Sequence, residues 1–298
     1  MQVGSFLLNL LKVHSNNMTR KRRKRYPPHG VFTEYINIPY MNDSNPQHTF
    51  DIYLAKENRK NCCIIDIHGG TYIFGQHQDN YPFGYPFLEN GFDFVTIDYQ
   101  PNNGKMDMKD LTDDIARNIN YLVEHLKDYG LENDRFVITG DSAGGHFALM
   151  FAEALCDKEY AKQLGYDFSG LEIKACLVNG PMYDYKGVRV NPVKDSGLKR
   201  MFGPNWADEE ARALACPKTH IGSLSCPLFV STCKNDFLRV QSLMLQEDMK
   251  SKDNIFKFID LDVDDKNVGH VHNVIEPSLK ESVYVNNEIM AFINECLK

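Results

Sequence analysis

The chain has 298 residues, of which 43% are hydrophobic and 24% are charged, so it is long enough to bury one large core. Its formal net charge of -7 supplies no basic surface for a polyanion, which argues against nucleic acid as the main partner. A neutral or small-molecule substrate fits this balance better.

The eight cysteines are scattered through apolar stretches rather than gathered in a short framework. This distribution favours buried free thiols in a reducing compartment over disulfides. Cys62 and Cys63 are adjacent, but no second close pair of His or Cys at metal-ligand spacing accompanies them. The sequence therefore predicts no zinc site.

The N-terminal segment, residues 1-32, joins an apolar stretch at residues 4-11 to the basic run Lys21 to Arg25. A secretory signal would place its positive charges before the apolar stretch, and no apolar run approaches the roughly 20 residues that span a bilayer. We therefore expect a cytoplasmic chain without stable membrane insertion, whose N-terminal segment forms a helical cap over the functional site. The basic run is interpreted as a solvated linker, with contact to anionic lipid or nucleic acid as the alternative.

From residue 33 onward, short strand-like runs alternate with longer helical runs, which predicts a sheet with crossover helices on both faces. The nearly all-apolar runs CCIIDI and RFVITG are typical of central parallel strands. The eight predicted strands are Glu34 to Tyr40, His48 to Leu54, Cys62 to Ile67, Phe92 to Asp98, Arg135 to Gly140, Ile173 to Asn179, Pro227 to Thr232 and Ile255 to Leu261.

Apolar residues at helical spacing from Leu111 to Leu126, ended by Gly130, predict one crossover helix, and residues 142-156 and 285-297 predict two more. Residues 181-215 interrupt the alternation with Pro, Gly and charged residues, so they are expected to form an inserted cap. The sequence thus predicts one domain over residues 33-298. An exposed edge strand in its last third could support a homodimer.

The strongest local motif is GDSAGG, residues 140-145, which follows an apolar strand and opens a helix. A serine on a tight strand-to-helix turn needs small neighbours, because its strained backbone brings the flanking residues close together. Gly140 and Gly144 meet that demand, and the helix N-terminus directs free N-H groups toward developing negative charge. The motif predicts Ser142 as a nucleophile, with a structural glycine turn as the alternative.

A second motif, His68-Gly69-Gly70, follows the predicted strand at residues 62-67. Two glycines allow the backbone to turn its N-H groups toward an oxygen, and such donors can lower the barrier of acyl transfer by on the order of several kcal/mol. The candidate oxyanion donors are the N-H groups of Gly69, Gly70 and Ala143. His68 is assigned a structural role.

A nucleophilic serine needs a base, and the base needs a carboxylate that orients it. Asp236 follows the predicted strand at residues 227-232, and His270 follows the strand at residues 255-261. The order Ser, Asp, His along the chain is the order expected for an α/β hydrolase. The sequence therefore predicts a triad of Ser142, Asp236 and His270.

These motifs, HGG after one strand, GDSAGG after a later one, and NDFLR and GHVHNV after the last strands, resemble the hormone-sensitive-lipase-like esterase family. The stretch LENDRFVITGDSAGG and residues 200-236 are similar as well, so the resemblance covers residues 33-298. It implies the α/β-hydrolase fold and a carboxylic-ester hydrolase with an N-terminal cap that prefers short or medium acyl chains. It implies no metal or organic cofactor.

Three positions depart from the pattern of that family. Thr71 stands where a third glycine is usual, so the oxyanion loop could be shaped differently, and Cys216-Pro217 replaces a common Ser-Pro. The family commonly has Phe two residues after the catalytic histidine, whereas this chain has His272. We expect His270 to be the base and His272 to be a packing or pocket residue, and an exchange of their roles is the alternative.

The stretch from Tyr72 to Phe87 is rich in aromatic residues that could line a pocket or stabilise a long loop. Only Tyr72, beside the oxyanion loop, is taken as a candidate substrate-binding residue. By analogy with the family, a small acyl group such as acetyl is the preferred substrate. An amide or peptide hydrolase with the same triad and a non-catalytic small-ligand-binding protein are the alternatives.

Overall fold

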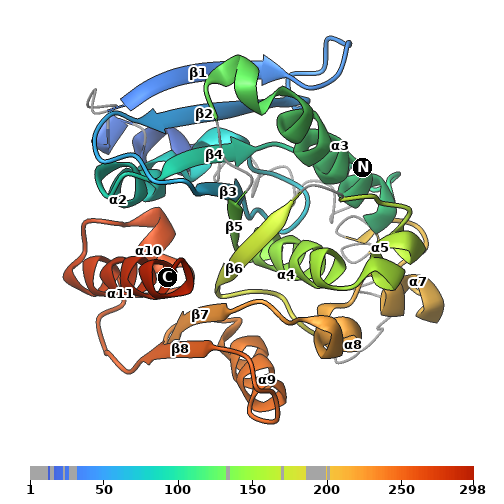
Figure 1. The fold of residues 1–298 in the computed structure, drawn as a ribbon. Helices are drawn as coiled ribbons and strands as arrows, with labels where there is room; N and C mark the ends of the chain where they lie inside the picture. The colour runs from blue at the N-terminus through green and yellow to red at the C-terminus, as the bar shows by residue number, and fades with distance from the viewer. Residues whose placement is uncertain are drawn as a thin grey trace.

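A sheet of eight strands forms the centre of the structure (Figure 1). The computed structural model describes residues 13, 17-22, 24-26, 32-131, 135-168, 171-185, 199 and 202-298. The strands are β1 (Phe32–Pro39), β2 (Thr49–Ala55), β3 (Cys63–Ile67), β4 (Asp93–Ile97), β5 (Arg135–Asp141), β6 (Glu172–Asn179), β7 (Leu228–Cys233) and β8 (Phe256–Leu261). Their order in the sheet is β1-β2-β4-β3-β5-β6-β7-β8. β2 pairs antiparallel with β1 and β4, and all other neighbours pair in parallel.

Helices cover both faces of this sheet. Figure 1 shows α3 (Met108–His125) and α4 (Ala143–Cys156) on one side, and α2 (Tyr81–Glu89) and α11 (Lys280–Cys296) on the other. The remaining α-helices of the described residues are α5 (Lys158–Leu164), α7 (Glu209–Leu214), α8 (Pro217–His220), α9 (Arg239–Met249) and α10 (His272–Ile275). Short 3-10 turns are η1 (His77–Asp79), η2 (Leu126–Tyr129) and η3 (Ile221–Ser223). The sheet is thus the middle of three layers.

All eight predicted strands are present, with ends that differ from the prediction by no more than two residues. Their central members are buried on both faces. In β3, for example, Ile65 belongs to the core cluster that includes α3 and α4, and its neighbour Ile64 belongs to the cluster that includes α2 and α11. Because successive side chains of a strand point to opposite faces, a continuous apolar run serves both layers.

The aromatic stretch before β4 differs from the loop considered in the sequence analysis. Residues 81-89 form α2, with Pro82 in the first helical turn, a position that proline tolerates because its missing N-H has no intrahelical partner there. Phe83 and Phe87 are buried and pack edge-to-face with ring centroids 5.0 Å apart. These aromatic side chains therefore form core rather than a wall for a ligand.

A buried ionic network fixes the loop between β3 and α2. The His77 ring lies between two carboxylates, with Nδ1 2.8 Å from Asp98 and Nε2 3.0 Å from Asp51. Asp98 also accepts a hydrogen bond from the ring of His68 at 3.0 Å. Burial opposes protonation of His77, but its hydrogen bonds to Asp51 and Asp98 outweigh that effect and raise its pKa to about 9.

The described part of the N-terminal segment is helical at residues 17-22 and 24-25. Arg22 donates a hydrogen bond to the Asp79 carbonyl at 2.8 Å, and Arg25 forms an ion pair with Glu276 at 2.6 Å. These two arginines thus contact the body of the protein, although the side chain of Arg25 is 57% exposed, and the interpretation of the basic run as a solvated linker stays a prediction. The apolar stretch at residues 4-11 lies outside the described residues.

The predicted cap insertion, about residues 181-215, is described at residues 181-185, 199 and 202-215. There Phe202 and Trp206 are buried against the body of the protein, and Asp208 caps the start of α7 by accepting hydrogen bonds from two backbone N-H groups. Residues 186-198, 200 and 201 lie outside the described residues, so the division into domain and cap stays a prediction.

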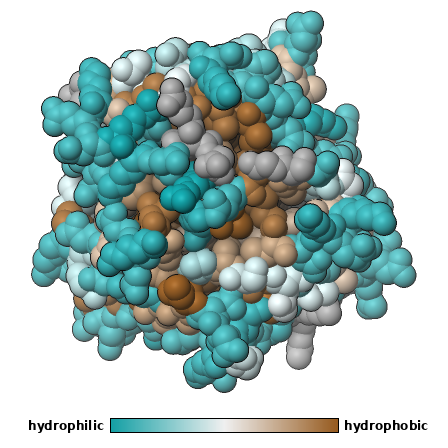
Figure 2. All heavy atoms as spheres, in the orientation of Figure 1, coloured by the Kyte–Doolittle hydropathy of each residue, from teal (hydrophilic) through white to brown (hydrophobic). Residues whose placement is uncertain are grey.

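One face of the molecule is mostly polar. Figure 2 shows hydrophilic side chains over much of one face, with apolar side chains in its middle. Among the described residues, no helix combines the length and the apolar character needed to cross a bilayer.

The sheet ends at β8, the edge strand predicted for the last third of the chain. An edge strand leaves one row of backbone N-H and C=O groups without a partner strand, which another chain can use. The homodimer that this edge could support stays a prediction.

We expect His77 to make the stability of the protein depend on pH in the alkaline range. A group whose folded pKa is raised stabilises the fold fully below its unfolded pKa of about 6.5, and that contribution disappears as the pH rises toward 9. The loss should be on the order of 3 kcal/mol. Urea unfolding at pH 6.5 and pH 9 should show it in the wild type and much less in His77→Gln. Equal pH dependence of the two proteins would contradict the prediction.

Candidate active site

The turn between β5 and α4 carries Ser142 in a strained backbone conformation, with φ 54° and ψ -114°. Non-glycine residues adopt such angles only where the surrounding structure enforces them. The neighbours enforce them here, because a Cβ on Gly144 would collide with the carbonyl oxygen of Ile67, and one on Gly140 would collide with the backbone of Gly144. The side chain of Ser142 makes no capping hydrogen bond to α4, so its hydroxyl is not used to hold the helix.

Ser142 opens into a cavity of about 260 Å³ at the carboxyl ends of the parallel strands. Loops after β3, β5, β7 and β8 all contribute to the wall, together with the N-terminal helix. The residues that line it include Thr19, Arg22, Gly69, Gly70, Thr71, Asp79, Ser142, Phe237 and His270. Open sheets of this type commonly bind their ligands at this edge.

The predicted base and its orienting acid lie together. Nδ1 of His270 is 2.7 Å from Oδ1 of Asp236, and the side chain of Asp236 is only 1% exposed. Asp236 also accepts hydrogen bonds from the N-H of Leu238 at 2.7 Å and the hydroxyl of Thr232 at 3.2 Å, which fix its orientation. This arrangement assigns the proton of the neutral ring to Nδ1.

The other ring nitrogen of His270, Nε2, is available to accept a proton. Nε2 is buried and has no hydrogen-bond partner within the described part of the chain, and His270 lines the same cavity as Ser142. The two loops that carry the pair are tied together by a parallel bridge between Asn235 and Gly269. A histidine held through Nδ1 with Nε2 facing a serine cavity is the arrangement that general-base catalysis requires.

His272 lies elsewhere. Its side chain is buried, and its Nδ1 is 2.9 Å from the hydroxyl of Ser282 in α11. Burial lowers the pKa of His272 to about 4, so the ring is neutral at neutral pH. It does not line the cavity of Ser142, so of the two histidines the geometry brings only His270 to the nucleophile.

The oxyanion loop differs in one residue from the expectation. The N-H of Gly69 donates to Oδ1 of Asp141 at 2.9 Å, so this group is not available to a substrate. Within the described residues, the N-H groups of Gly70 and Thr71 have no acceptor, and both residues line the cavity. The N-H of Ala143 begins α4, where no intrahelical partner exists. The donors that the structure offers are therefore those of Gly70, Thr71 and Ala143.

Thr71 takes the place of a third glycine with φ 51°, and Tyr72 follows with φ 66°. The loop thus keeps the left-handed backbone that glycine favours, although neither residue is glycine. The ring of Tyr72 turns into the core, where it is 1% exposed and packs on His146, Phe147 and Phe202. Tyr72 was predicted to bind substrate, but it is not among the residues that line the cavity.

The sequence analysis missed several residues at this site, and three of them show how. Asp141 anchors the oxyanion loop, and Arg22 lines the cavity from the N-terminal helix. Phe237 packs on the ring of His270 in a tilted arrangement, with ring centroids 4.2 Å apart, and is 70% exposed. Asp141 and Phe237 each stand directly beside a predicted triad member, and that adjacency was a usable signal. Nothing in the local sequence distinguishes Arg22 from its basic neighbours.

No group of three or more His, Cys, Asp or Glu side chains in the described ranges is arranged to hold a metal ion. The eight cysteines are free thiols, six of them buried. The predicted absence of a cofactor stays a prediction.

Comparison with known sequences gives a family and several named relatives. Residues 50–249 match the family model described as BD-FAE. The chain is 27% identical over 180 residues to the probable carboxylic ester hydrolase LipM of Mycobacterium tuberculosis, covering 59% of this chain and 41% of that protein. It is 25% identical over 145 residues to a probable isoprenylcysteine alpha-carbonyl methylesterase, ICMEL1, of Arabidopsis thaliana, covering 48% of this chain and 30% of that protein. The chain thus spans less than half the length of these relatives.

Solved structures show the same fold. Esterase B from Lactobacillus rhamnosis superposes with a TM-score of 0.84 at 18% identity, covering 99% of this chain and 96% of that one. A bacterial heroin esterase superposes with a TM-score of 0.71 at 16% identity, covering 96% of this chain and 91% of that one. The predicted α/β-hydrolase fold is confirmed. Because the family model matches more than half of the chain, the chain belongs to the BD-FAE family, among the hormone-sensitive-lipase-like esterases that its motifs resemble.

Proposed function

We propose that this chain is a serine carboxylic-ester hydrolase that acts through Ser142, His270 and Asp236. The observation that carries the proposal is that His270 is held by Asp236 through Nδ1 and leaves Nε2 unpartnered in the cavity of Ser142. The ester-hydrolase names of the relatives support the same chemistry.

The mechanism begins when Nε2 of His270 takes the proton of the Ser142 hydroxyl and the oxygen attacks the ester carbonyl. The negative charge on the carbonyl oxygen is stabilised by the N-H groups of Gly70, Thr71 and Ala143. His270 then protonates the departing alcohol, and an acyl-enzyme remains. Water activated by His270 releases the acid, while Asp236 stabilises the protonated ring.

We propose short acyl groups, with acetyl preferred, as the substrates. The cavity of about 260 Å³ lies just below the usual range of small-molecule pockets, and the N-terminal helix lines one side of it. An amide or peptide hydrolase would use the same groups, so the turnover of an ester and of its matching amide must be compared. A non-catalytic binding protein is disfavoured because Ser142, Asp236 and His270 are all present and grouped.

Ser142→Ala should abolish ester hydrolysis. With p-nitrophenyl esters from acetyl to long chains, the wild type should be fastest on short chains, and the variant should lose on the order of a thousandfold or more in kcat. An inactive wild type across the series would contradict the proposed activity. If the wild type were fastest on long-chain esters, the proposed preference for short acyl groups would be contradicted, but the proposed ester hydrolysis would not.

Substitution of His270 should lower kcat far more than substitution of His272. His270→Ala removes the base and should lower kcat on the order of a thousandfold. His272→Gln keeps a polar group near Ser282 and should leave kcat within about tenfold of the wild type, because His272 does not face the serine. The measurement is kcat on p-nitrophenyl acetate, with circular dichroism as a check of folding. The opposite ranking would assign the base to His272.

Asp141 should act as a positioning residue for the oxyanion loop. Asp141→Ala releases the N-H of Gly69 and should lower kcat about 10- to 100-fold through misplacement of the donors of Gly70 and Thr71. Asp141→Asn keeps the side-chain oxygen acceptor and should retain most of kcat, with KM little changed in both variants. Equal loss in Asp141→Asn would show that hydrogen-bond acceptance is not the role of this side chain.

A further inference from the structure

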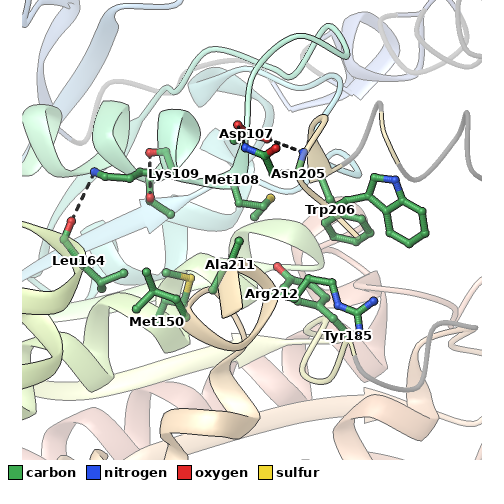
Figure 3. A pocket seen from close by; sticks show the side chains of 14 residues that line it. Asp107, Met108, Lys109, Met150, Leu164, Tyr185, Asn205, Trp206, Ala211 and Arg212 are labelled. Atoms are coloured by element: carbon green, nitrogen blue, oxygen red, sulfur yellow. Dashed lines mark hydrogen bonds between the residues drawn. The ribbon is translucent and has the colours of Figure 1, made fainter. Parts of the chain in front are cut away.

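A second cavity of about 290 Å³ lies between the start of α3, the middle of α4, the end of α5 and the cap around α7 (Figure 3). Its walls are mainly apolar, formed by Met108, Met150, Leu164, Phe202 and Leu214. Its size is close to that of the cavity of Ser142. The proposed ester hydrolysis makes no use of it.

The two cavities are separate. They share no lining residue within the described part of the chain. The ring of Tyr72, next to the oxyanion loop, packs on Phe202 with ring centroids 5.1 Å apart, and Phe202 packs on Tyr185 at 4.8 Å. Phe202 and Tyr185 line the second cavity, so this aromatic cluster stands between it and the oxyanion loop.

Two N-H donors at the second cavity have no acceptor. Nε of Arg212 and Nε1 of Trp206 are both buried, and neither has a hydrogen-bond partner among the described residues. Trp206 as a whole is buried, with only 5% of its surface exposed. In Figure 3 both residues lie on one side of the view, opposite Leu164 and Met150. A buried donor without an acceptor is destabilising unless something supplies one.

The other polar residues of this cavity are already satisfied by protein groups. Asp107 accepts hydrogen bonds from the backbone N-H and the side-chain amide of Asn205, at 2.9 and 2.7 Å. Lys109 forms an ion pair with Asp113 at 2.6 Å. Arg212 has no ion pair within the described part of the chain. Among the described residues, Arg212 is therefore the cation at this cavity that has no carboxylate partner.

We propose that the second cavity binds a medium-chain aliphatic carboxylic acid, with its carboxylate at Arg212 and its chain among the apolar walls. A guanidinium prefers planar oxyanions, and a single guanidinium suits the one negative charge of a carboxylate better than the two of a phosphate. The volume of 290 Å³ holds about ten non-hydrogen atoms at roughly 30 Å³ for each water-sized group, which corresponds to octanoate. The site goes beyond the proposed hydrolysis and does not depend on it.

The chain contains a built-in reporter for this site, because Trp206 is its only tryptophan. Titration of the full chain with sodium octanoate should change the tryptophan emission with a saturable curve. 1-Octanol has the same chain length but no charge, and it should bind the wild type at least about tenfold more weakly than octanoate does. Arg212→Met should lose at least about tenfold in its affinity for octanoate. Arg212→Lys keeps the positive charge without the planar guanidinium, so its affinity for octanoate should lie between those of the wild type and Arg212→Met.

Two controls separate this site from the catalytic one. Ser142→Ala should bind octanoate with the wild-type affinity, and Lys127→Met, which removes an exposed positive charge at the other end of α3, should do the same. Octanoate should not compete with p-nitrophenyl acetate at the concentrations that saturate the emission change. Because the titration needs no turnover, its result stands whether or not the chain hydrolyses esters.

Three results would overturn the proposal. An emission that does not respond to octanoate, or that responds equally in Arg212→Met, would show that the unpaired donors recognise no carboxylate. Competitive inhibition of ester hydrolysis with the dissociation constant of the titration would show that the cavity is part of the catalytic site.

Discussion

The close approach of the start of α4 to the end of β3 is the constraint on which the rest of the site depends. Any side chain at Gly144 would meet the carbonyl oxygen of Ile67, so only glycine lets the helix lie this near the neighbouring strand. That approach holds Ser142 at φ 54° and places its hydroxyl beside the oxyanion loop, which leaves the same strand end. The free energy gained by packing a large core offsets the strain of this one turn.

The sheet was predictable because its strands are apolar on both faces and bounded by polar or glycine-rich turns. The helix α2 was not predictable, since its aromatic residues and two prolines argue locally against a helix. Burial of its aromatic side chains against β2 and β4 outweighs that preference. Local propensity is weak against a large buried aromatic surface. The GDSAGG motif predicted Ser142, and Asp236 and His270 were predicted because each follows a later strand.

Other parts of the site depend on contacts between distant segments, which no local pattern reveals. Gly69 was expected to face the substrate, but its N-H is taken by Asp141, 72 residues later in the chain. The choice between His270 and His272 depends on which neighbours their rings meet, Asp236 in one case and Ser282 of α11 in the other. Tyr72 turns inward because the left-handed backbone of its loop directs its side chain into the core.

The N-terminal helix joins two sides of the cavity that come from opposite ends of the sequence. Arg22 contacts the carbonyl of Asp79, just before α2, and Arg25 pairs with Glu276, just after α10. One side of the cavity is therefore held in place by residues that contribute nothing to the sheet. Chains that share this sheet can therefore differ in the shape of the cavity through changes in this short helix, while the strands stay the same.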